Sequence, residues 1–305
     1  MRSVVAFIKL GRPLFLGGGF ILFGLGAAIA AAAGHAVDLT RYALGQAAVT
    51  AFQLMTHYAN DYFDYDADLA NATPTAWSGG SRVLPDGELP RSVALIAAGV
   101  LAAIGIALTT SLAAIGSGGW TSLTLAIVFV LAWTYSAPPV RLCARGLGEL
   151  DTALVVTGLV PWLGFYLQAP DLRGVGALAL TIVPLALLQL AMLIAIEFPD
   201  AAGDAATGKR TLVVRLGAPA AAWLYAAVTA AAFGWPLVAL ALGLPWLVAL
   251  ALLVPAPIAV WRIARVGDHA DRHAFERLTL FAVFLVVATS AAALVAWLLV
   301  QRGAP

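Results

Sequence analysis

The chain has 305 residues, of which 62% are hydrophobic and 11% charged, and its mean hydropathy is +0.93. This composition excludes a soluble globular domain, in which about 25% of the residues are charged. The formal net charge of +1 excludes a general electrostatic attraction to nucleic acid, and the single cysteine excludes an intramolecular disulfide. We therefore expect an integral membrane protein whose surroundings are a lipid bilayer.

A helix that crosses the hydrocarbon core of a bilayer requires roughly 20 apolar residues. Nine stretches without Asp, Glu, Lys or Arg qualify: residues 14–33, 42–59, 92–111, 120–140, 152–170, 174–196, 216–242, 244–261 and 278–300. The first stretch is longer than the roughly 7–15 apolar residues of a signal peptide, so we interpret it as a retained helix. The sequence predicts an all-α membrane protein with nine transmembrane helices in a single domain over residues 1–305.

Basic residues are distributed unevenly between the two sides that these nine helices define. On the side of the N-terminus lie 14 of the 17 Lys and Arg residues, and 3 lie on the other side. The positive-inside rule then places the N-terminus in the cytoplasm and the C-terminus across the membrane. The Asp and Glu residues divide in the same way, 14 against 2. We therefore expect the polar chemistry, and any active site, on the cytoplasmic side of the cell inner (plasma) membrane.

Two acidic clusters follow the second and the sixth predicted helices. Both have the spacing i, i+3 and i+7, the first as Asp61, Asp64 and Asp68 and the second as Glu197, Asp200 and Asp204. Matched motifs in corresponding positions are typical of membrane folds built from internal repeats. The spacing predicts two pseudo-repeated four-helix units followed by a ninth helix.

Residues three, four and seven positions apart share one face of a helix, so each cluster predicts a polar ridge. Asn60 extends the first ridge, whereas Asp66 points elsewhere. An unpaired Asp near the middle of a bilayer costs roughly 2.5–3.5 kcal/mol, so several of them would offset the roughly 5–15 kcal/mol by which a domain is stable. The carboxylates must therefore lie at the interface, face an aqueous cavity or bind cations. A solvated helix end could explain one cluster, but two matched clusters on one side argue against it.

The residue types favour magnesium and a phosphorylated ligand. Oxygen ligands suit Mg²⁺, which usually bridges a few carboxylates to substrate phosphates. We expect the catalytic, metal-binding carboxylates to be Asp61, Asp64, Asp68, Asp200 and Asp204. Lys and Arg residues on the same side could neutralise the remaining charge of a metal-bound diphosphate, namely Arg82, Arg141, Arg145, Lys209 and Arg210. Positive-inside topology remains an alternative explanation for the two arginines at 141 and 145.

Three motifs together resemble the UbiA superfamily of intramembrane aromatic prenyltransferases. They are Asn60-Asp61-x-x-Asp64-x-x-x-Asp68, Tyr135-Ser136-x-Pro138-Pro139 and Asp200-x-x-x-Asp204-x-x-x-Gly208-Lys209-Arg210-Thr211-Leu212. The resemblance implies a helical bundle around a central cavity, in which the two acidic motifs face each other. It also implies that Mg²⁺ ions on both motifs hold a prenyl diphosphate, whose prenyl group passes to a small aromatic acceptor. The substrate-binding residues that we expect are Asn60, Arg82, Tyr135, Arg141, Glu197, Lys209 and Arg210.

Within the family, the segments 60–65 and 79–84 look most like the 1,4-dihydroxy-2-naphthoate prenyltransferases of menaquinone biosynthesis. Glu197 is a departure, because family members often carry Asn three residues before the second Asp motif. Prenyltransferases for 4-hydroxybenzoate, homogentisate, chlorophyll, haem or glyceryl phosphate remain alternatives. A secondary transporter of an aromatic acid would place its ionisable groups near the membrane midplane, and a non-catalytic assembly subunit would not need two metal clusters. Nothing in the sequence implies a protein partner.

Overall fold

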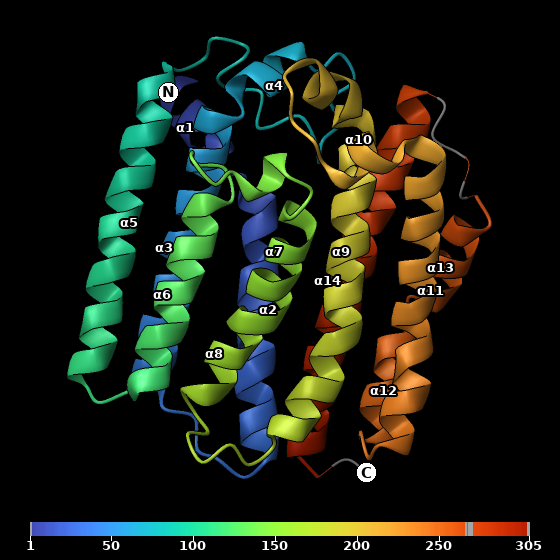
Figure 1. Ribbon diagram of the computed structural model, residues 1–305. Helices are drawn as coiled ribbons and strands as arrows, with labels where there is room; N and C mark the ends of the chain where they lie inside the picture. Colours follow the sequence, from blue (N-terminus) through green and yellow to red (C-terminus); the bar gives the residue numbers. More distant parts are fainter. Residues whose placement is uncertain (1, 266, 268–270, 304–305) are drawn as a thin grey trace.

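A computed structural model describes residues 2–265, 267 and 271–303, and this part of the chain contains helices and no strands. Six helical spans within it are long and apolar enough to cross a membrane: α2 (Pro13–Ala32), α5 (Arg91–Ala114), α9 (Val175–Ala206), α11 (Ala218–Ala241), the pair α12 (Trp246–Leu253) and α13 (Ala256–Ile263), and α14 (Arg272–Gln301). Figure 1 shows these helices side by side in one bundle. The chain is therefore a multi-pass membrane protein.

The other three predicted segments are also helical, but they are shorter, less apolar or interrupted. They are α3 (Leu39–Phe63), α6 (Gly119–Thr134) and the series α7 (Gly148–Leu154), η2 (Val155–Leu159) and α8 (Val160–Tyr166). The prediction that one helix covers residues 120–140 was wrong at its end, because α6 stops at Thr134 before the Pro138–Pro139 pair, where the chain cannot continue a helix. One turn of π-helix, η2, interrupts the segment predicted at 152–170.

Glycines bring two of the central helices into close contact. A Cβ atom on Gly26 of α2 would overlap the carbonyl oxygen of Pro161, and one on Gly164 of α8 would overlap that of Phe23. Small residues allow this approach, which is how helices associate in a membrane, where apolar burial alone gives little attraction. The contact holds α2 against α8 on one side of the bundle and leaves the polar ends of the neighbouring helices free to converge.

The outward faces of the bundle carry large apolar side chains. On α5, Ile96 is 65% exposed and Val100 54% exposed. A soluble domain would place polar residues on such a face, whereas a lipid bilayer accommodates it. The buried side chains form two clusters, one around Phe23 and Phe52 and the other around Ile194 and Val286.

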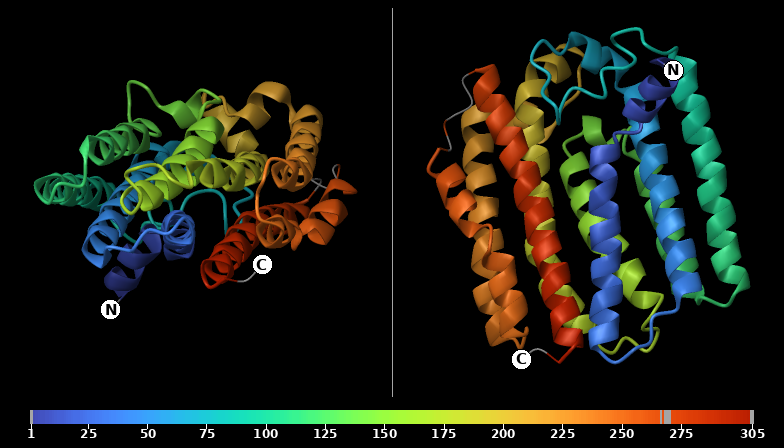
Figure 2. Two further views of the ribbon diagram at one scale, coloured as in Figure 1. Left: turned by 90° about the horizontal axis from the view of Figure 1, so that it is seen from below. Right: turned by 180° about the vertical axis from the view of Figure 1, so that it is seen from behind.

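The short helices gather at one end of the bundle. Figure 1 places α1 (Arg2–Leu10), α4 (Tyr65–Ala70) and α10 (Leu212–Leu216) together at its top, and Figure 2 shows the same grouping from behind. The helix α3 ends there, and α9 continues ten residues beyond its predicted end at residue 196, to Ala206. Both acidic clusters therefore lie at this polar end.

Candidate active site

A cavity of about 270 Å³ lies between α2, α3, α6, α7, α9 and α14. At the polar end of the bundle, charged and amide side chains line it: Asn60, Asp64, Asp68, Glu197, Asp200, Asp204 and Lys209. Its remaining walls are largely apolar and include Val49, Phe52, Val128, Val155, Val156, Met192, Leu193, Val283 and Val286. The cavity thus combines a charged head with an apolar channel, which fits an amphiphilic ligand with an anionic end.

The first acidic cluster is not the continuous helical ridge that the spacing predicts. The chain interrupts the helix at Asp64, which follows α3 and precedes α4. Asn60, Asp64 and Asp68 line the cavity, and Asn60 Nδ2 donates to Asp64 Oδ2 at 2.8 Å. The exposed side chain of Asp66 lies outside the cluster, as predicted.

Asp61, which the spacing places on the same ridge, is not among the residues that line the cavity. It pairs with the guanidinium of Arg12 and accepts hydrogen bonds from the Ser81 hydroxyl and backbone amide. Asp61 is 1% exposed, so its charge is compensated inside the protein. A carboxylate that is this deeply buried requires a cationic partner, and the partly exposed Arg12 supplies it. Arg12 itself lines the cavity.

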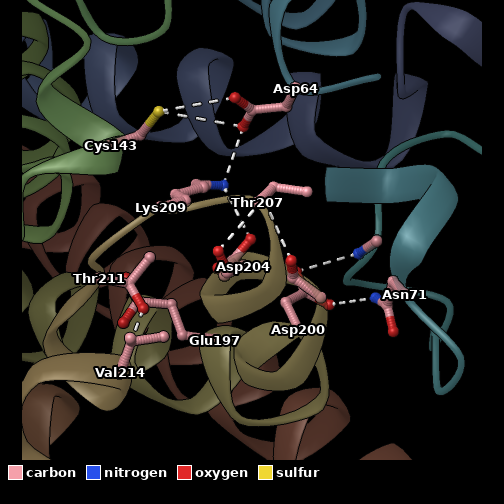
Figure 3. Close-up of polar contacts among 12 residues, drawn as sticks. Asp64, Asn71, Cys143, Glu197, Asp200, Asp204, Thr207, Lys209, Thr211 and Val214 are labelled. Carbon is pink, nitrogen blue, oxygen red and sulfur yellow. Dashed lines mark hydrogen bonds and ion pairs between the residues drawn. The ribbon is translucent and has the colours of Figure 1, made fainter. Parts of the chain in front are cut away.

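The second cluster projects from the last three turns of α9, and Figure 3 shows how its members point. Asp204 faces Lys209, whose Nζ lies 3.4 Å from Asp204 Oδ1. Asp200 holds the segment that follows α4, accepting from Asn71 Nδ2 at 2.7 Å and from the backbone amide of Gly79 at 3.1 Å. The second motif therefore contacts both the lysine and the loop of the first motif.

Lys209 joins the two acidic motifs. Its Nζ donates to Asp64 Oδ2 at 2.9 Å while it pairs with Asp204, so one ammonium group bridges α9 to the end of α3. Burial alone would lower the pKa of Lys209, but the carboxylates of Asp64 and Asp204 outweigh it and raise the pKa well above its usual value. Lys209 is therefore a permanent cation at the head of the cavity.

A glycine-containing loop closes the head of the cavity. Gly79 and Gly80 both have positive φ and line the cavity, and a side chain on Gly80 would overlap the carboxylate of Asp68. Backbone atoms therefore approach Asp68 where a side chain could not. Burial raises the pKa of Asp68 well above its usual value, and the nearby carboxylates of Asp61, Asp64 and Asp200 add to this rise against the effect of Arg12.

Three predicted substrate-binding cations lie outside the cavity lining. Arg210 is exposed, and its backbone amide donates to Ala144 O at 3.0 Å. Arg82 donates to the Asp68 carbonyl oxygen and pairs with Asp86 at 3.4 Å. The Arg141 guanidinium lies 3.8 Å from Asp64 Oδ1. Tyr135, by contrast, lines the cavity as expected.

Two buried glutamates hold the segment that follows Lys209. Glu149, on α7, accepts from the backbone amide of Leu212 at 2.8 Å, and Glu197, on α9, accepts from that of Val213 at 3.3 Å. Both amides belong to the first turn of α10, where backbone N–H groups lack helical partners. Glu197 therefore anchors α10 in addition to lining the cavity.

The site is compatible with Mg²⁺ but offers no complete protein cage. Among the described residues, no three His, Cys, Asp or Glu side chains converge closely enough to hold a metal ion. The donor set is nevertheless a group of carboxylates, and Mg²⁺ usually binds one or two carboxylates together with substrate phosphates. Lys209 already occupies a cationic position between Asp64 and Asp204. The carboxylates therefore fit a metal that arrives with a phosphorylated ligand.

Sequence reasoning missed Arg12, Glu149 and Asp151. Arg12 stands among the basic residues of the N-terminal segment, and charge asymmetry alone explains them. Glu149 and Asp151 lie in a short polar stretch before an apolar segment and carry no repeated spacing. Only the packing of α7 against α9 shows that both carboxylates are buried, at 1% and 8% exposure.

Comparison with known proteins accounts for this arrangement. The model of the UbiA prenyltransferase family matches residues 20–287. The chain is 32% identical over 229 residues to a 1,4-dihydroxy-2-naphthoate octaprenyltransferase of Mycobacterium tuberculosis, with 74% of each chain covered. It is 30% identical over 237 residues to a digeranylgeranylglyceryl phosphate synthase of Thermococcus kodakarensis, with 75% of this chain and 76% of that protein covered.

A solved structure has the same fold. It is a UbiA homolog from Archaeoglobus fulgidus bound to GPP and Mg²⁺, with a TM-score of 0.57 and 13% sequence identity over 94% of this chain and 99% of that chain. The extent of the family match and the identity to the curated relatives make this protein a prenyltransferase rather than a transporter or an assembly subunit. The chain belongs to the UbiA prenyltransferase family.

Proposed function

We propose that this protein transfers a prenyl group from a prenyl diphosphate to 1,4-dihydroxy-2-naphthoate, in a Mg²⁺-dependent reaction of menaquinone biosynthesis. The observation that carries the proposal is the position of Lys209 between Asp64 and Asp204 at the charged head of an apolar cavity. A diphosphate with a long apolar tail matches both parts of this cavity. The A. fulgidus homolog, bound to GPP and Mg²⁺, supports the same substrate class.

The charged head would stabilise the departing diphosphate. Asp64, Asp68, Asp200 and Asp204 would hold Mg²⁺, which when bound neutralises diphosphate charge as a Lewis acid. Lys209 adds a fixed positive charge beside the same carboxylates. Because negative charge accumulates on the leaving group as the allylic C–O bond breaks, this preorganised cation lowers the energy of the transition state more than that of the bound substrate.

The apolar channel would bind the prenyl tail and exclude water. Phe52, Val155, Met192 and Val286 contribute apolar atoms from four different elements, α3, η2, α9 and α14. Loss of diphosphate leaves an allylic centre with positive charge, which water would intercept. A dry channel protects this centre until the acceptor attacks.

The names of two relatives support two candidate acceptors. The M. tuberculosis relative, named for 1,4-dihydroxy-2-naphthoate, supports a naphthoate acceptor. The Thermococcus relative, named for digeranylgeranylglyceryl phosphate, makes glyceryl phosphate a second candidate at nearly the same identity. We retain 4-hydroxybenzoate as a third candidate, since it is an aromatic acceptor within the same superfamily.

We also propose that all nine predicted segments cross the plasma membrane, as two four-helix units and a ninth helix, with the active site and N-terminus in the cytoplasm. The basic residues near the ends of α1, α10 and α13 support this orientation. A cysteine introduced at Ser81 should react with a membrane-impermeant reagent from the cytoplasmic side, and one introduced at Val37 from the opposite side. Labelling of both from one side would contradict the nine-helix arrangement.

One experiment tests the reaction and separates the acceptors. Purified protein is incubated with Mg²⁺, geranylgeranyl diphosphate and, in separate reactions, 1,4-dihydroxy-2-naphthoate, 4-hydroxybenzoate or a glyceryl phosphate acceptor, and products are identified by mass spectrometry. We expect a prenylated naphthalene product that requires Mg²⁺. Product with glyceryl phosphate alone would reassign the acceptor, and product formed at full rate in EDTA would contradict the metal-dependent mechanism.

A further inference from the structure

Asp151 is a buried carboxylate in the cavity, and it has no role in the proposed binding of the diphosphate. It lies on α7, is 8% exposed and lines the cavity. In the described part of the chain, Asp151 Oδ1 and Glu149 Oε2 are the buried carboxylate oxygens without a hydrogen-bond partner, and of these two residues Asp151 alone lines the cavity. A buried polar atom without a partner is energetically unfavourable. It therefore indicates either an uncompensated free-energy cost or a missing ligand.

The wall around Asp151 places its carboxylate at the boundary between the charged and apolar parts of the cavity. Thr152, Val155, Val156 and Val160 follow it on the same wall, and the three valines make the deeper part apolar. The wall bends through the π-helical turn η2 immediately beyond α7, and such turns occur frequently at functional sites. Asp151 is thus the polar end of an apolar wall.

The start of α7 rests against residues beside the charged head of the cavity. A Cβ atom on Gly148 would lie 2.9 Å from Cys143 Cα and 3.2 Å from the Tyr135 ring. The Cys143 thiol in turn lies 3.8 Å from Asp64 Oδ1. Asp151 follows Gly148 by three residues, which is about one helical turn. It therefore lies about one turn farther along the cavity wall than Gly148.

This position is where an acceptor must meet the reactive carbon. With the diphosphate at Lys209 and the prenyl tail in the apolar channel, C1 of the prenyl group lies at the boundary between them. In the transfer, C1 forms a bond to a ring carbon or hydroxyl oxygen of the acceptor, and the C1–O bond breaks with its electron pair leaving on the diphosphate. The acceptor is then neutralised by breaking the O–H bond of its hydroxyl group, whose electron pair stays on the acceptor, and in a water-poor site a protein group must accept the proton.

We propose that Asp151 Oδ1 accepts a hydrogen bond from a hydroxyl group of the acceptor and takes the proton released on prenyl transfer. This assignment rests on the proposed prenyl transfer and adds the acceptor side of the reaction, with a hydroxyl-bearing acceptor as the ligand class. Asp64, Asp204 and Lys209 engage one another at the head of the cavity, whereas Asp151 has a free oxygen for a second ligand.

The test compares Asp151→Asn with Asp151→Glu and with Asp66→Asn, an exposed carboxylate outside the cavity. Two readouts are measured: steady-state prenyl transfer with a hydroxylated aromatic acceptor, and equilibrium binding of geranylgeranyl diphosphate with Mg²⁺. We expect Asp151→Asn to lower kcat/KM for the acceptor by about 10²-fold or more, Asp151→Glu to restore part of it, and diphosphate binding to stay unchanged in both. Unchanged diphosphate binding also shows that the variants are folded.

An acceptor analogue sharpens the test. Replacing the acceptor hydroxyl by its methyl ether should slow the wild-type protein, while Asp151→Asn should add little to that loss, because both changes remove the same hydrogen bond. Full acceptor kinetics in Asp151→Asn, or a loss of diphosphate binding equal to the loss of transfer, would overturn the role of Asp151 alone. A wild-type protein that forms no product with any acceptor would overturn the proposed function and this role with it.

Discussion

Lys209 Nζ lies 2.9 Å from Asp64 Oδ2, although the two residues stand 145 positions apart in the chain. The contact joins the two acidic motifs, because the same ammonium group also lies 3.4 Å from Asp204 Oδ1. It depends on two helix ends meeting at one end of the bundle and on the position of α10. Glu149 and Glu197 accept hydrogen bonds from the first turn of α10. The cation that the diphosphate requires is thus already in place before the substrate binds, which is the arrangement that preorganised electrostatic catalysis requires.

Replacing Lys209 should slow the chemical step. We expect Lys209→Ala to lower kcat by about 10²-fold or more, the effect of losing one donor from a preorganised site, with a smaller change in the KM of the acceptor. Lys9→Ala is the matched control, because Lys9 is the other lysine of the chain and pairs with Glu88 on the surface. A Lys209→Ala variant with normal kcat and weakened acceptor binding would move Lys209 to the acceptor side of the cavity.

Removing single carboxylates should weaken the Mg²⁺-dependent binding of prenyl diphosphate. Asp64→Asn and Asp204→Asn each take away one oxygen ligand at the head of the cavity, so we expect Mg²⁺-dependent binding of prenyl diphosphate to weaken at least tenfold and turnover to be abolished. Asp66→Asn serves as the control, since Asp66 is exposed and lies outside the cavity lining. Equal Mg²⁺ requirements in all three variants would show that the carboxylates do not hold the metal.

The membrane location and the helical segments could be predicted from the sequence, because long runs without charge have one stable form in a bilayer. The interruptions could not. The end of α6 at Thr134 follows a proline pair, but the π-helical turn after Leu154 and the break at Asp64 depend on packing between helices. Periodicity describes a helix as if it were uninterrupted, so it cannot locate such breaks.

The meeting of the two acidic motifs was expected from the family resemblance, whereas the roles of neighbouring residues could not be predicted. Lys209 and Arg210 are adjacent and chemically alike, yet Lys209 lines the cavity and Arg210 is exposed. Asp61 belongs to the motif by spacing, but it pairs with Arg12, which is 49 positions away, and is not among the residues that line the cavity. Which member of a motif faces the ligand depends on a partner that local sequence does not contain.

The raised pKa of Asp68 should couple metal binding to pH. Burial and the neighbouring carboxylates raise this pKa, so Asp68 retains its proton at pH values where an ordinary Asp is ionised. Mg²⁺ requires the ionised form, so apparent Mg²⁺ affinity should rise as pH increases, with proton release on binding. Calorimetry of Mg²⁺ and geranylgeranyl diphosphate binding in two buffers of different ionisation enthalpy measures this release. We expect less proton release in Asp68→Asn, and equal release in Asp68→Asn and the wild type would contradict the coupling.

The buried ion pair between Arg12 and Asp61 should contribute to stability as well as to the shape of the cavity. Arg12→Ala leaves the Asp61 charge buried at 1% exposure with Ser81 as its remaining partner. Removing one member of a buried pair costs roughly 3–5 kcal/mol, so we expect a clear loss of thermal stability in detergent micelles. Because the loss comes from an uncompensated charge, the double variant Arg12→Met with Asp61→Asn should recover a large part of it.

Lys9→Ala again provides the matched control, since it breaks an ion pair whose side chains are 46% and 40% exposed. Pairs of this kind contribute roughly 0–1 kcal/mol, so the unfolding temperature should change little. If Arg12→Ala proves no less stable than Lys9→Ala, Asp61 must find another partner or take up a proton. If Arg12→Ala is unstable and the double variant is no better, Arg12 acts through its contacts with the cavity wall rather than through the charge of Asp61.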